Sequence, residues 1–570
     1  MWDHSRRLAM IRRLTSTKLA CSKTLVDLTT YNDTAMWWFV DLDFKIFLGA
    51  LNRAPAERPR FPNFARSAIF SRIGIVLDIL QTILTRLIVA LCTRRRTSRA
   101  RVGSSKIIFR AQDIQWRVIR DDETGHLKRS DAFFDSVLKR LVTEYECLGV
   151  YPIVIRRPYR LLSREAFHSY RILIDKLRNW YVQHKPFQLY WSLETRWAET
   201  NAFRHFGKVW SILAQDETFL RICRTGAGED AGRIRTRVQY YFLARFSRIV
   251  GLIEMAGRMI DEEKPNLILV ANEYGVFERA LVVAAKRRGI PTLAVQHGVI
   301  HSEHKGYMYR KHEISPDGSA ESPYCPIPDK TAVYGPVHKH MLTKLSAYPE
   351  GSVVVTGQPR YDRLKHVERL YSRERFLRKY NIDLNDKIIL WTTQCHALSA
   401  DENRRNLRCV LEVVRDLTNV TLIIKQHPGE GMNHTRMIKG YLVKYKTNAV
   451  ITPGDSDTYE QLYACDLMIS RTSTTVIEAV ALDKPVIMLE LAADASPIGL
   501  DYVKEGVAIK VCREEELGPA IEKLLVDDSQ LARNRKHFVE KYLYKLDGKA
   551  SARLVNLIWK MMRSPGKKHH

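Results

Sequence analysis

Short apolar runs alternate with stretches of helical periodicity over residues 331–555. Each run has the length of a buried strand, and the stretches between them are long enough to cross a sheet. The expected strands are 331–334, 353–356, 388–392, 421–425, 449–451, 467–469, 485–489 and 507–511. The expected helices are 403–417, 435–445, 459–464 and 475–482. Strands that alternate with helices require crossover connections, so this part predicts a doubly wound, mostly parallel sheet.

Residues 106–320 show the same alternation less regularly. The expected strands are 106–109, 151–155, 188–191, 267–270 and 292–296, and the clearest helical patterns are 235–258 and 278–288. Three prolines in residues 321–330 predict a stiff connection between two domains. We therefore predict an α/β protein with two Rossmann-like domains, 106–320 and 331–555, that face each other across a cleft. Whether the last helix crosses back onto the first domain stays open.

Residues 1–105 form a basic, partly apolar N-terminal extension of irregular pattern. Residues 37–39 (Trp-Trp-Phe) and 44–51 indicate a helix or hairpin that packs on another element. Residues 73–92 are strongly apolar with two charges near the middle, and five arginines follow within residues 94–101. Central charges make a membrane-spanning helix costly. A helix on an anionic membrane surface and an ordinary packing helix both remain open.

The 570 residues carry a net charge of +28, and residues 1–110 alone hold 20 Lys and Arg against 7 Asp and Glu. Such charge fits an anionic membrane, a polyanionic substrate or a nucleic acid. No helix-turn-helix, zinc-finger or RNP-like pattern accompanies it, so we expect no nucleic-acid partner. The nine cysteines are scattered without a Cys-x-x-Cys pair, and no apolar signal segment follows the first residues. Both features favour a reducing, cytoplasmic location.

A hydroxyl-rich turn follows the expected strand 467–469 and begins the next helix. Ser470, Ser473 and Thr474 lie where the free backbone N–H groups of a helix N-terminus can bind phosphate. Glu478 falls about one turn into the helix, within reach of a sugar hydroxyl beside that phosphate. An ordinary helix cap uses the same residue types for structural reasons alone.

A second candidate site lies at the end of the expected strand 421–425. Lys425 and His427 lie on the same side by strand alternation, and Pro428 fixes the turn that orients the imidazole. A cation and an imidazole at the carboxyl end of a strand suit a phosphate leaving group. A surface turn with an incidental histidine is the competing interpretation. Two phosphate-suited turns on neighbouring strands strengthen the functional interpretation.

Two polar residues, Glu273 and His297, end expected strands of the first domain, and a glycine follows each of them closely. A carboxylate and an imidazole at one sheet edge suit a general base and a positioning group. A satisfied polar pair in a turn is the structural alternative. His301 and His304 lie nearby, and His297 and His301 have an i,i+4 spacing. Gly298 and the strand–turn context argue against a helix there, and no acidic frame accompanies the histidines, so we predict no metal site.

Residues 354–362 form a further strand-and-turn motif. Gly357 ends the strand and Arg360 follows Pro359 in the turn. This motif would contact the base or phosphate of a donor through its backbone and Arg360, or it is a structural turn.

Together these motifs resemble enzymes with two facing Rossmann-like domains, the GT-B fold of many nucleotide-sugar glycosyltransferases. More narrowly, the chain resembles the transferases of bacterial surface-polysaccharide assembly. That group includes capsule-type sugar transferases, polysialyltransferase-like enzymes and CDP-glycerol glycerophosphotransferases. The resemblance covers roughly residues 265–555. It rests on Gln296-His297-Gly298, Lys425-Gln426-His427-Pro428, Ser470 with Ser473-Thr474, Glu478-Ala479 and Asp547-Gly548-Lys549-Ala550-Ser551.

The resemblance implies that the second domain holds a UDP- or CMP/CDP-linked donor without a metal or other cofactor. His427 and the Ser473–Thr474 turn would bind its phosphates and Glu478 its ribose, while His297 would act as a base or stabiliser. The chain also departs from the narrower patterns. Asn272-Glu273-Tyr274-Gly275 matches the acidic motif of sialyltransferase-like members only in part. Gln296 stands where glycerophosphotransferases tend to have Trp, so the donor stays open.

We therefore expect a metal-independent glycosyltransferase that moves a sugar from a nucleotide-linked donor to a glycan or lipid-linked acceptor, as in capsule or lipopolysaccharide assembly. Glu273 or His297 would deprotonate the acceptor hydroxyl. Residues 73–101 would hold the enzyme peripherally on the inner face of the membrane. A CDP-glycerol-type glycerophosphotransferase and a non-hydrolysing UDP-sugar 2-epimerase are alternatives within the fold. A nucleic-acid binding protein is the alternative from a different class.

Overall fold

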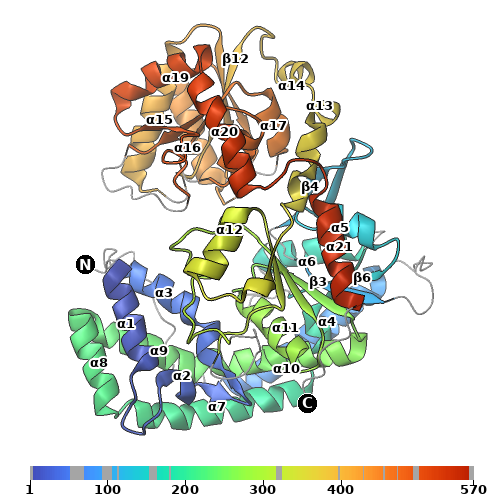
Figure 1. Cartoon of the computed structure of the whole chain (residues 1–570), viewed down its shortest axis with the longest axis vertical. Coiled ribbons are helices and arrows are strands. Elements are labelled where there is room, and N and C mark those ends of the chain that lie inside the picture. The colour runs from blue at the N-terminus through green and yellow to red at the C-terminus, as the bar shows by residue number, and fades with distance from the viewer. Residues whose placement is uncertain are drawn as a thin grey trace.

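The computed structural model describes residues 4–51, 70–92, 105–111, 115–152, 164–178, 182–315, 324–395, 398–427, 429–453, 456–471, 473–491 and 500–563. Two α/β units dominate the molecule, and a layer of helices packs on the first of them (Figure 1).

The first unit is built on a seven-stranded parallel sheet with the order β11-β10-β9-β8-β3-β6-β7. Its strands are β3 (Lys106–Arg110), β6 (Glu146–Tyr151), β7 (Gln183–Pro186), β8 (Leu267–Ala271), β9 (Thr292–Val295), β10 (Lys330–Val333) and β11 (Val353–Val355). Helices α10 (Phe246–Glu263) and α11 (Val276–Lys286) cover one face, and α5 (Asp135–Leu141) and α6 (Arg164–Leu177) cover the other. The strand order reverses between β3 and β8, which defines a doubly wound sheet.

The second unit has a six-stranded parallel sheet with the order β14-β13-β12-β15-β16-β17. Its strands are β12 (Lys387–Thr392), β13 (Val420–Lys425), β14 (Ala449–Thr452), β15 (Leu467–Ser470), β16 (Val486–Leu489) and β17 (Ile509–Val511). One face carries α15 (Ala400–Arg415), α16 (Met432–Tyr445) and α19 (Leu517–Val526). The other face carries α14 (Arg373–Lys379), α17 (Thr458–Ala464), α18 (Thr475–Ala481) and α20 (Ser529–Tyr542). The order reverses between β12 and β15, as a doubly wound sheet requires, and the predicted fold class is confirmed.

Two strands of the first sheet differ from the prediction. The expected strand 188–191 lies mostly in a 3-10 helix, Phe187–Tyr190, and the edge strand is β7 instead. Because β7 reads Gln-His-Lys-Pro, it has no apolar run that would identify it as a strand. Strand β6 begins at Glu146 rather than at 151 and ends before Pro152, which has no backbone N–H to donate. Residues 153–155 of that predicted strand lie outside the described part of the chain.

The change from one sheet to the other falls later than predicted. Strand β10 pairs with β9, and β11 pairs with β10, so that Thr331 lies beside Ala294 on one side and Val353 on the other. Parallel pairing is made by backbone groups, and nothing in the sequence of these strands identifies their partner. The two sheets are therefore divided between β11 and β12, and the predicted boundary at 331 is wrong as a division between them.

Residues 4–51 of the N-terminal extension form an integral layer of the first unit. It comprises α1 (His4–Ser16), α2 (Leu25–Leu28), the hairpin β1 (Thr30–Tyr31) and β2 (Thr34–Ala35), and α3 (Asp41–Ala50). These elements share an apolar core with α7 (Leu193–Leu213), α8 (Glu217–Ala227), α9 (Ala231–Tyr240) and α10. Trp37 is fully buried, with ring centroids 5.4 Å from Phe44 and 6.4 Å from Tyr241. The expectation that residues 37–39 and 44–51 pack on another element is confirmed.

The last helix, α21 (Ala550–Arg563), crosses back onto the first unit (Figure 1). Leu554 and Ile558 are buried in the core that α5 and α6 form with the first sheet. Asp362, in the 3-10 helix η11 (Pro359–His366), accepts the backbone N–H groups of Ala550 and Ser551 at 2.7 and 2.8 Å. The start of α21 is thereby held at the junction of the two units, next to η11, which leads into α13 (Val367–Leu370).

Candidate functional site

The strand order of the second sheet reverses at the ends of β12 and β15, where ligands of such folds bind. Thr392, the last residue of β12, donates a hydrogen bond from its hydroxyl to the Ser470 hydroxyl at 2.8 Å. Ser470 is buried, so its hydroxyl ties the two strand ends together. The structure thus gives Ser470 a positioning role at the reversal point, where the sequence predicted a phosphate contact.

The turn after Ser470 begins α18. The Ser473 hydroxyl accepts the Thr475 N–H at 3.2 Å and donates to the Thr475 hydroxyl at 3.0 Å, while Thr474 is exposed and makes no side-chain cap. This is the helix-cap geometry that the sequence left open as the structural alternative. Since α18 spans only seven residues, its dipole is a small source of positive charge.

Glu478 forms the centre of a charged cluster at the junction of the two units. Its Oε1 accepts a hydrogen bond from Arg360 Nη2 at 2.8 Å, and its side chain is 9% exposed. The other carboxylate oxygen, Oε2, is buried and has no hydrogen-bond partner among the described residues. Burial raises the pKa of Glu478, and the Arg360 charge opposes that rise. The free oxygen is therefore placed to accept a hydrogen bond from a ligand hydroxyl.

His297, which follows β9, belongs to the same cluster. Its ring stacks on Phe133 with centroids 6.4 Å apart. Burial lowers the pKa of His297, and the Arg360 and Arg117 charges lower it further. The imidazole is therefore neutral at neutral pH and competent to accept a proton. Arg117 was not singled out by the sequence, because it lies on a short strand without a recognisable motif.

Lys425 and His427 lie at the end of β13, as predicted. Lys425 is buried, and its Nζ donates to the Pro453 carbonyl at 3.4 Å. His427 Nδ1 accepts the Gly429 N–H at 3.0 Å, so its exchangeable proton lies on Nε2. Glu430 holds the loop by accepting the Thr393 hydroxyl and the Cys395 N–H at 2.8 and 2.6 Å. Pro428 lies outside the described residues.

Glu273 is placed differently from the other candidates. It is 3% exposed, and both of its oxygens are occupied, one by the Tyr348 hydroxyl at 2.6 Å and one by the Thr331 hydroxyl at 3.0 Å. Burial raises its pKa to about 7, while these two hydrogen bonds act in the opposite direction. Tyr348 and Thr331 belong to the core of the first unit. The geometry of Glu273 therefore fits a structural carboxylate with satisfied hydrogen bonds better than a catalytic base at the donor site.

Gly357 serves the joint between the units. Its φ of +79° lies in the left-handed region, and a Cβ there would meet Ala550 Cβ and Arg553 Nη2, both at 3.1 Å. Arg553 Nε also donates to the Thr356 carbonyl at 2.7 Å. In the turn that was predicted to contact a donor, Gly357 packs against α21. Arg360, on the same turn, donates a hydrogen bond to Glu478.

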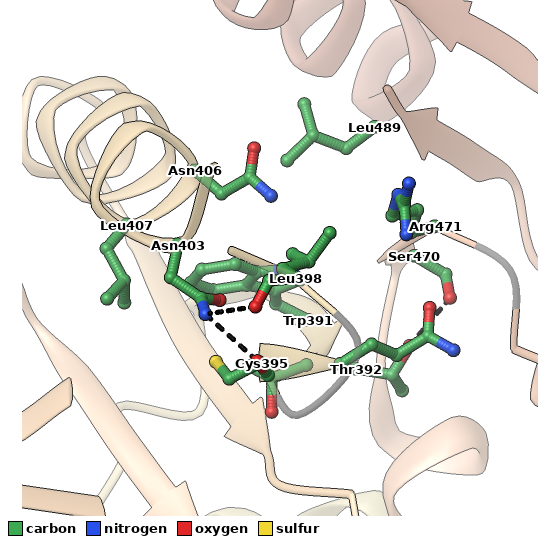
Figure 2. Close-up of a pocket in the computed structure, with 12 residues that line it drawn as sticks. Trp391, Thr392, Cys395, Leu398, Asn403, Asn406, Leu407, Ser470, Arg471 and Leu489 are labelled. Carbon is green, nitrogen blue, oxygen red and sulfur yellow. Dashed lines mark hydrogen bonds between the residues drawn. The ribbon is translucent and has the colours of Figure 1, made fainter. Parts of the chain in front are cut away.

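A small pocket opens beside Ser470 on the α15 side of the second sheet (Figure 2). Asn403 braces it by donating from Nδ2 to the Cys395 carbonyl at 2.9 Å. An adjoining pocket of about 180 Å³ shares Asn406, Arg471 and Leu489 as lining residues. The sequence analysis did not identify Asn403, Asn406 or Arg471. Figure 2 shows the Asn406 and Arg471 side chains extending toward this space from α15 and from the end of β15.

Two doubly wound parallel sheets in one chain, with a cation-rich cluster at the junction of their units, define a GT-B fold. The model of the family "CDP-Glycerol:Poly(glycerophosphate) glycerophosphotransferase" matches residues 250–560, more than half of the chain. The chain therefore belongs to this family, and the resemblance to the transferases of surface-polysaccharide assembly is confirmed. Within the described part of the chain, no group of three or more His, Cys, Asp or Glu is arranged to hold a metal ion.

Similar solved structures share little sequence with the chain. The UDP-GlcNAc 2-epimerase from Neisseria meningitidis bound to UDP-GlcNAc is 12% identical with a TM-score of 0.45, over 80% of this chain and 99% of the other. A glycosyltransferase from Rickettsia africae is 12% identical with a TM-score of 0.44, over 81% and 100%. The wall teichoic acid polymerase TagF is 11% identical with a TM-score of 0.44, over 88% and 99%. No curated protein matches the chain.

Proposed function

We propose that the protein transfers a sugar from a UDP- or CMP/CDP-linked donor to a hydroxyl of a surface-glycan or lipid-linked acceptor, without a metal or other cofactor. The observation that carries the proposal is the junction cluster of His297, Arg360 and Glu478. It combines a neutral imidazole, a guanidinium and a carboxylate with one oxygen left for a ligand. Capsule and lipopolysaccharide assembly are the processes in which such transfer would operate.

Each group has a defined task in this reaction. Glu478 Oε2 accepts a hydrogen bond from a ribose hydroxyl of the donor. His297 takes the proton of the acceptor hydroxyl as that oxygen attacks the anomeric carbon. The bond from that carbon to the donor phosphate breaks, and Arg360, Lys425 and the Nε2–H of His427 stabilise the charge on the leaving phosphate. Positive charge from these side chains takes the place of a metal ion.

The family match favours a second candidate, the transfer of glycerol phosphate from a CDP-linked donor. The acceptor hydroxyl would then attack phosphorus and release CMP, with the same base and the same cationic groups. Turnover assays with UDP-sugars, CMP-sugars and CDP-glycerol separate the two candidates by the donor consumed. Epimerised UDP-sugar formed without an acceptor would contradict both.

Substitution of the base tests the mechanism itself. His297→Ala should lower kcat/KM by about 100-fold or more, because general base catalysis contributes on the order of 10²–10⁴. His427→Gln places an amide N–H near the position of Nε2–H and should retain more activity than His427→Ala. Full activity in His297→Ala, with circular dichroism unchanged from wild type, would remove His297 from the mechanism.

A peripheral position on the cytoplasmic face of a membrane forms part of the proposal. In α4 (Phe70–Cys92), Thr82 and Thr85 face inward, while Leu80, Ile83, Leu87 and Leu91 are 49, 49, 55 and 84% exposed. Within the described residues, no helix is long and apolar enough to cross a membrane. An exposed apolar stripe followed in sequence by five arginines in residues 94–101 suits an anionic bilayer surface.

Vesicle sedimentation tests this position. Wild-type protein should bind vesicles that contain phosphatidylglycerol more strongly than pure phosphatidylcholine vesicles. The double variant Leu80→Glu/Leu87→Glu should bind the anionic vesicles at least 10-fold more weakly. Leu193→Glu alters a leucine that is 68% exposed on α7 and serves as the matched control. Equal binding by the double variant and the control would contradict the assignment of α4.

A further inference from the structure

A β-hairpin of the first unit reaches across to the second. Strands β4 (Trp116–Arg120) and β5 (Leu127–Asp131) pair with each other and lie outside both large sheets, between β3 and α5 in sequence. Figure 1 shows β4 near α13, where the two units meet. The hairpin follows the carboxyl end of β3 in the chain. It is the part of the first unit that extends over the junction of the two units.

Ion pairs fix the hairpin on the second unit. Arg120 Nη2 lies 3.2 Å from Glu460 Oε1, and Arg120 Nε lies 3.7 Å from Asp457, both on or beside α17. Asp122, in the turn of the hairpin, forms an ion pair with Arg363, whose Nη2 lies 3.2 Å from Asp122 Oδ1. The Asp122 backbone carbonyl accepts a hydrogen bond from Arg369 Nη2 at 2.9 Å. These contacts join the end of β4 and the turn of the hairpin to two separate elements, α17 and the segment of Arg363 and Arg369.

Arg117 lies on β4, one residue after its start and three residues before Arg120, and is half-buried. Its charge acts on Arg360, Glu478 and Tyr459 of the junction cluster, and also on His297 and on the buried Asp131. Two guanidinium groups therefore face one region in which Glu478 is already paired with Arg360. Burial and the like charge of Arg360 lower the pKa of Arg117, whereas the negative charges of Asp131 and Glu478 oppose that lowering.

Three buried polar atoms in the same region have no hydrogen-bond partner within the described structure. They are Arg360 Nε, Tyr459 Oη and Glu478 Oε2. Tyr459 is 9% exposed, so its hydroxyl cannot be satisfied by bulk water at little cost. Burying polar atoms without partners is costly, which indicates that a polar ligand completes the region.

We propose that Arg117 and Arg360 form a two-guanidinium clamp for a phosphate group, with the Tyr459 hydroxyl as a third hydrogen-bond donor. The clamp rests on the proposed function and deepens it, because Arg117 comes from the first unit and Arg360 from the segment that connects the two sheets. The phosphate belongs either to the nucleotide donor or to a phosphorylated acceptor. The hairpin β4–β5 is then the element through which the first unit takes part in phosphate binding.

Variants of the hairpin test the clamp. Arg117→Ala is compared with Arg117→Lys, which keeps the charge but loses the planar fork. The matched control is Arg129→Ala on β5, which removes one positive charge from the same hairpin at a side chain 45% exposed and 3.9 Å from Asp175. Thermal unfolding of each variant establishes that it is folded before binding is measured.

Binding of CDP, UDP and cytidine, and the KM of each substrate, are the readouts. If the phosphate belongs to the donor, Arg117→Ala should weaken CDP or UDP binding by roughly 10-fold or more, since charge-assisted hydrogen bonds to phosphate are stronger than neutral ones. Cytidine binding should not change. If the phosphate belongs to the acceptor, the acceptor KM should rise by a similar factor while nucleotide affinity stays constant. Arg117→Lys should recover part of either loss.

Unchanged nucleotide affinity together with an unchanged acceptor KM in Arg117→Ala would overturn the clamp. Equal losses in Arg117→Ala and Arg129→Ala would also overturn it, because a general charge effect would then explain both. Glu478→Ala, measured in parallel, separates this outcome from failure of the proposed donor site. A loss in Glu478→Ala without a loss in Arg117→Ala contradicts the clamp alone, whereas wild-type behaviour of both variants contradicts the donor site as well.

Discussion

Glu273 of the first unit and Glu478 of the second unit are similar in isolation but have opposite surroundings. Both follow strands of doubly wound sheets, both are buried, and burial raises the pKa of each. Glu273 has both oxygens hydrogen-bonded, to Tyr348 and Thr331. Glu478 shares one oxygen with Arg360 and keeps the other without a partner among the described residues. A buried carboxylate beside cations with one oxygen unoccupied, as in Glu478, is suited to bind a ligand. A carboxylate with both oxygens hydrogen-bonded, as in Glu273, is suited to stabilise a core.

The largest expected effect concerns Glu478. Glu478→Ala removes the acceptor for the donor ribose and leaves Arg360 without its partner, so kcat/KM should fall by about 100-fold. The fold should persist, because the side chain lies at the junction of the units rather than inside a sheet core. Steady-state kinetics with circular dichroism as the control measure both quantities. Activity within a factor of two of wild type would show that the two glutamates do not differ in function.

The matching substitution in the first unit should act on stability instead. Glu273→Ala leaves the Tyr348 and Thr331 hydroxyls without their acceptor in a closed core, which should lower the free energy of unfolding by about 2–3 kcal/mol. Activity per folded molecule should stay near the wild-type value. Urea unfolding and active-site titration separate the two effects. A loss of activity without a loss of stability would make Glu273 a catalytic candidate again.

A third expected effect is a pH dependence of stability that belongs to Glu273. Its pKa is raised from 4.5 to about 7 in the folded protein, so the folded state favours the protonated form. The resulting stability is fully present below pH 4.5 and is lost as the pH rises through about 7, up to about 3 kcal/mol in all. Glu273→Gln cannot ionise and should flatten the unfolding free energy across this window. An unchanged slope in that variant would show that other groups produce it.

The sequence predicted the second unit more completely than the first, and the reason is physical. Each of its buried strands is a continuous apolar run bounded by turn residues, a pattern that identifies a fully covered strand by itself. In the first unit, β7 is a polar edge strand and β10 and β11 follow the proline-rich segment 321–330. Apolar periodicity does not identify an edge strand, and it does not say which sheet a strand joins.

The candidate site shows the same division. Motif spacing identified His297, Lys425, His427, Ser470 and Glu478, because each follows a strand whose end could be recognised. Arg117 had no such marker, since it lies on a short hairpin strand whose importance depends on the distant residues it meets. The Glu273 side chain was recognised as a strand-end carboxylate, but its partners lie 58 and 75 residues away in the chain.

The sequence by itself determined the class of fold, the order of strands and helices in the second unit and the family to which the chain belongs, because these follow from local periodicity and from short motifs. The tertiary structure decided that β10 and β11 complete the first sheet, that α21 returns to the first unit, and that Arg360 and Glu478 form a pair. Those outcomes depend on backbone pairing and on charges brought together from distant positions, and such contacts leave no local pattern in the chain.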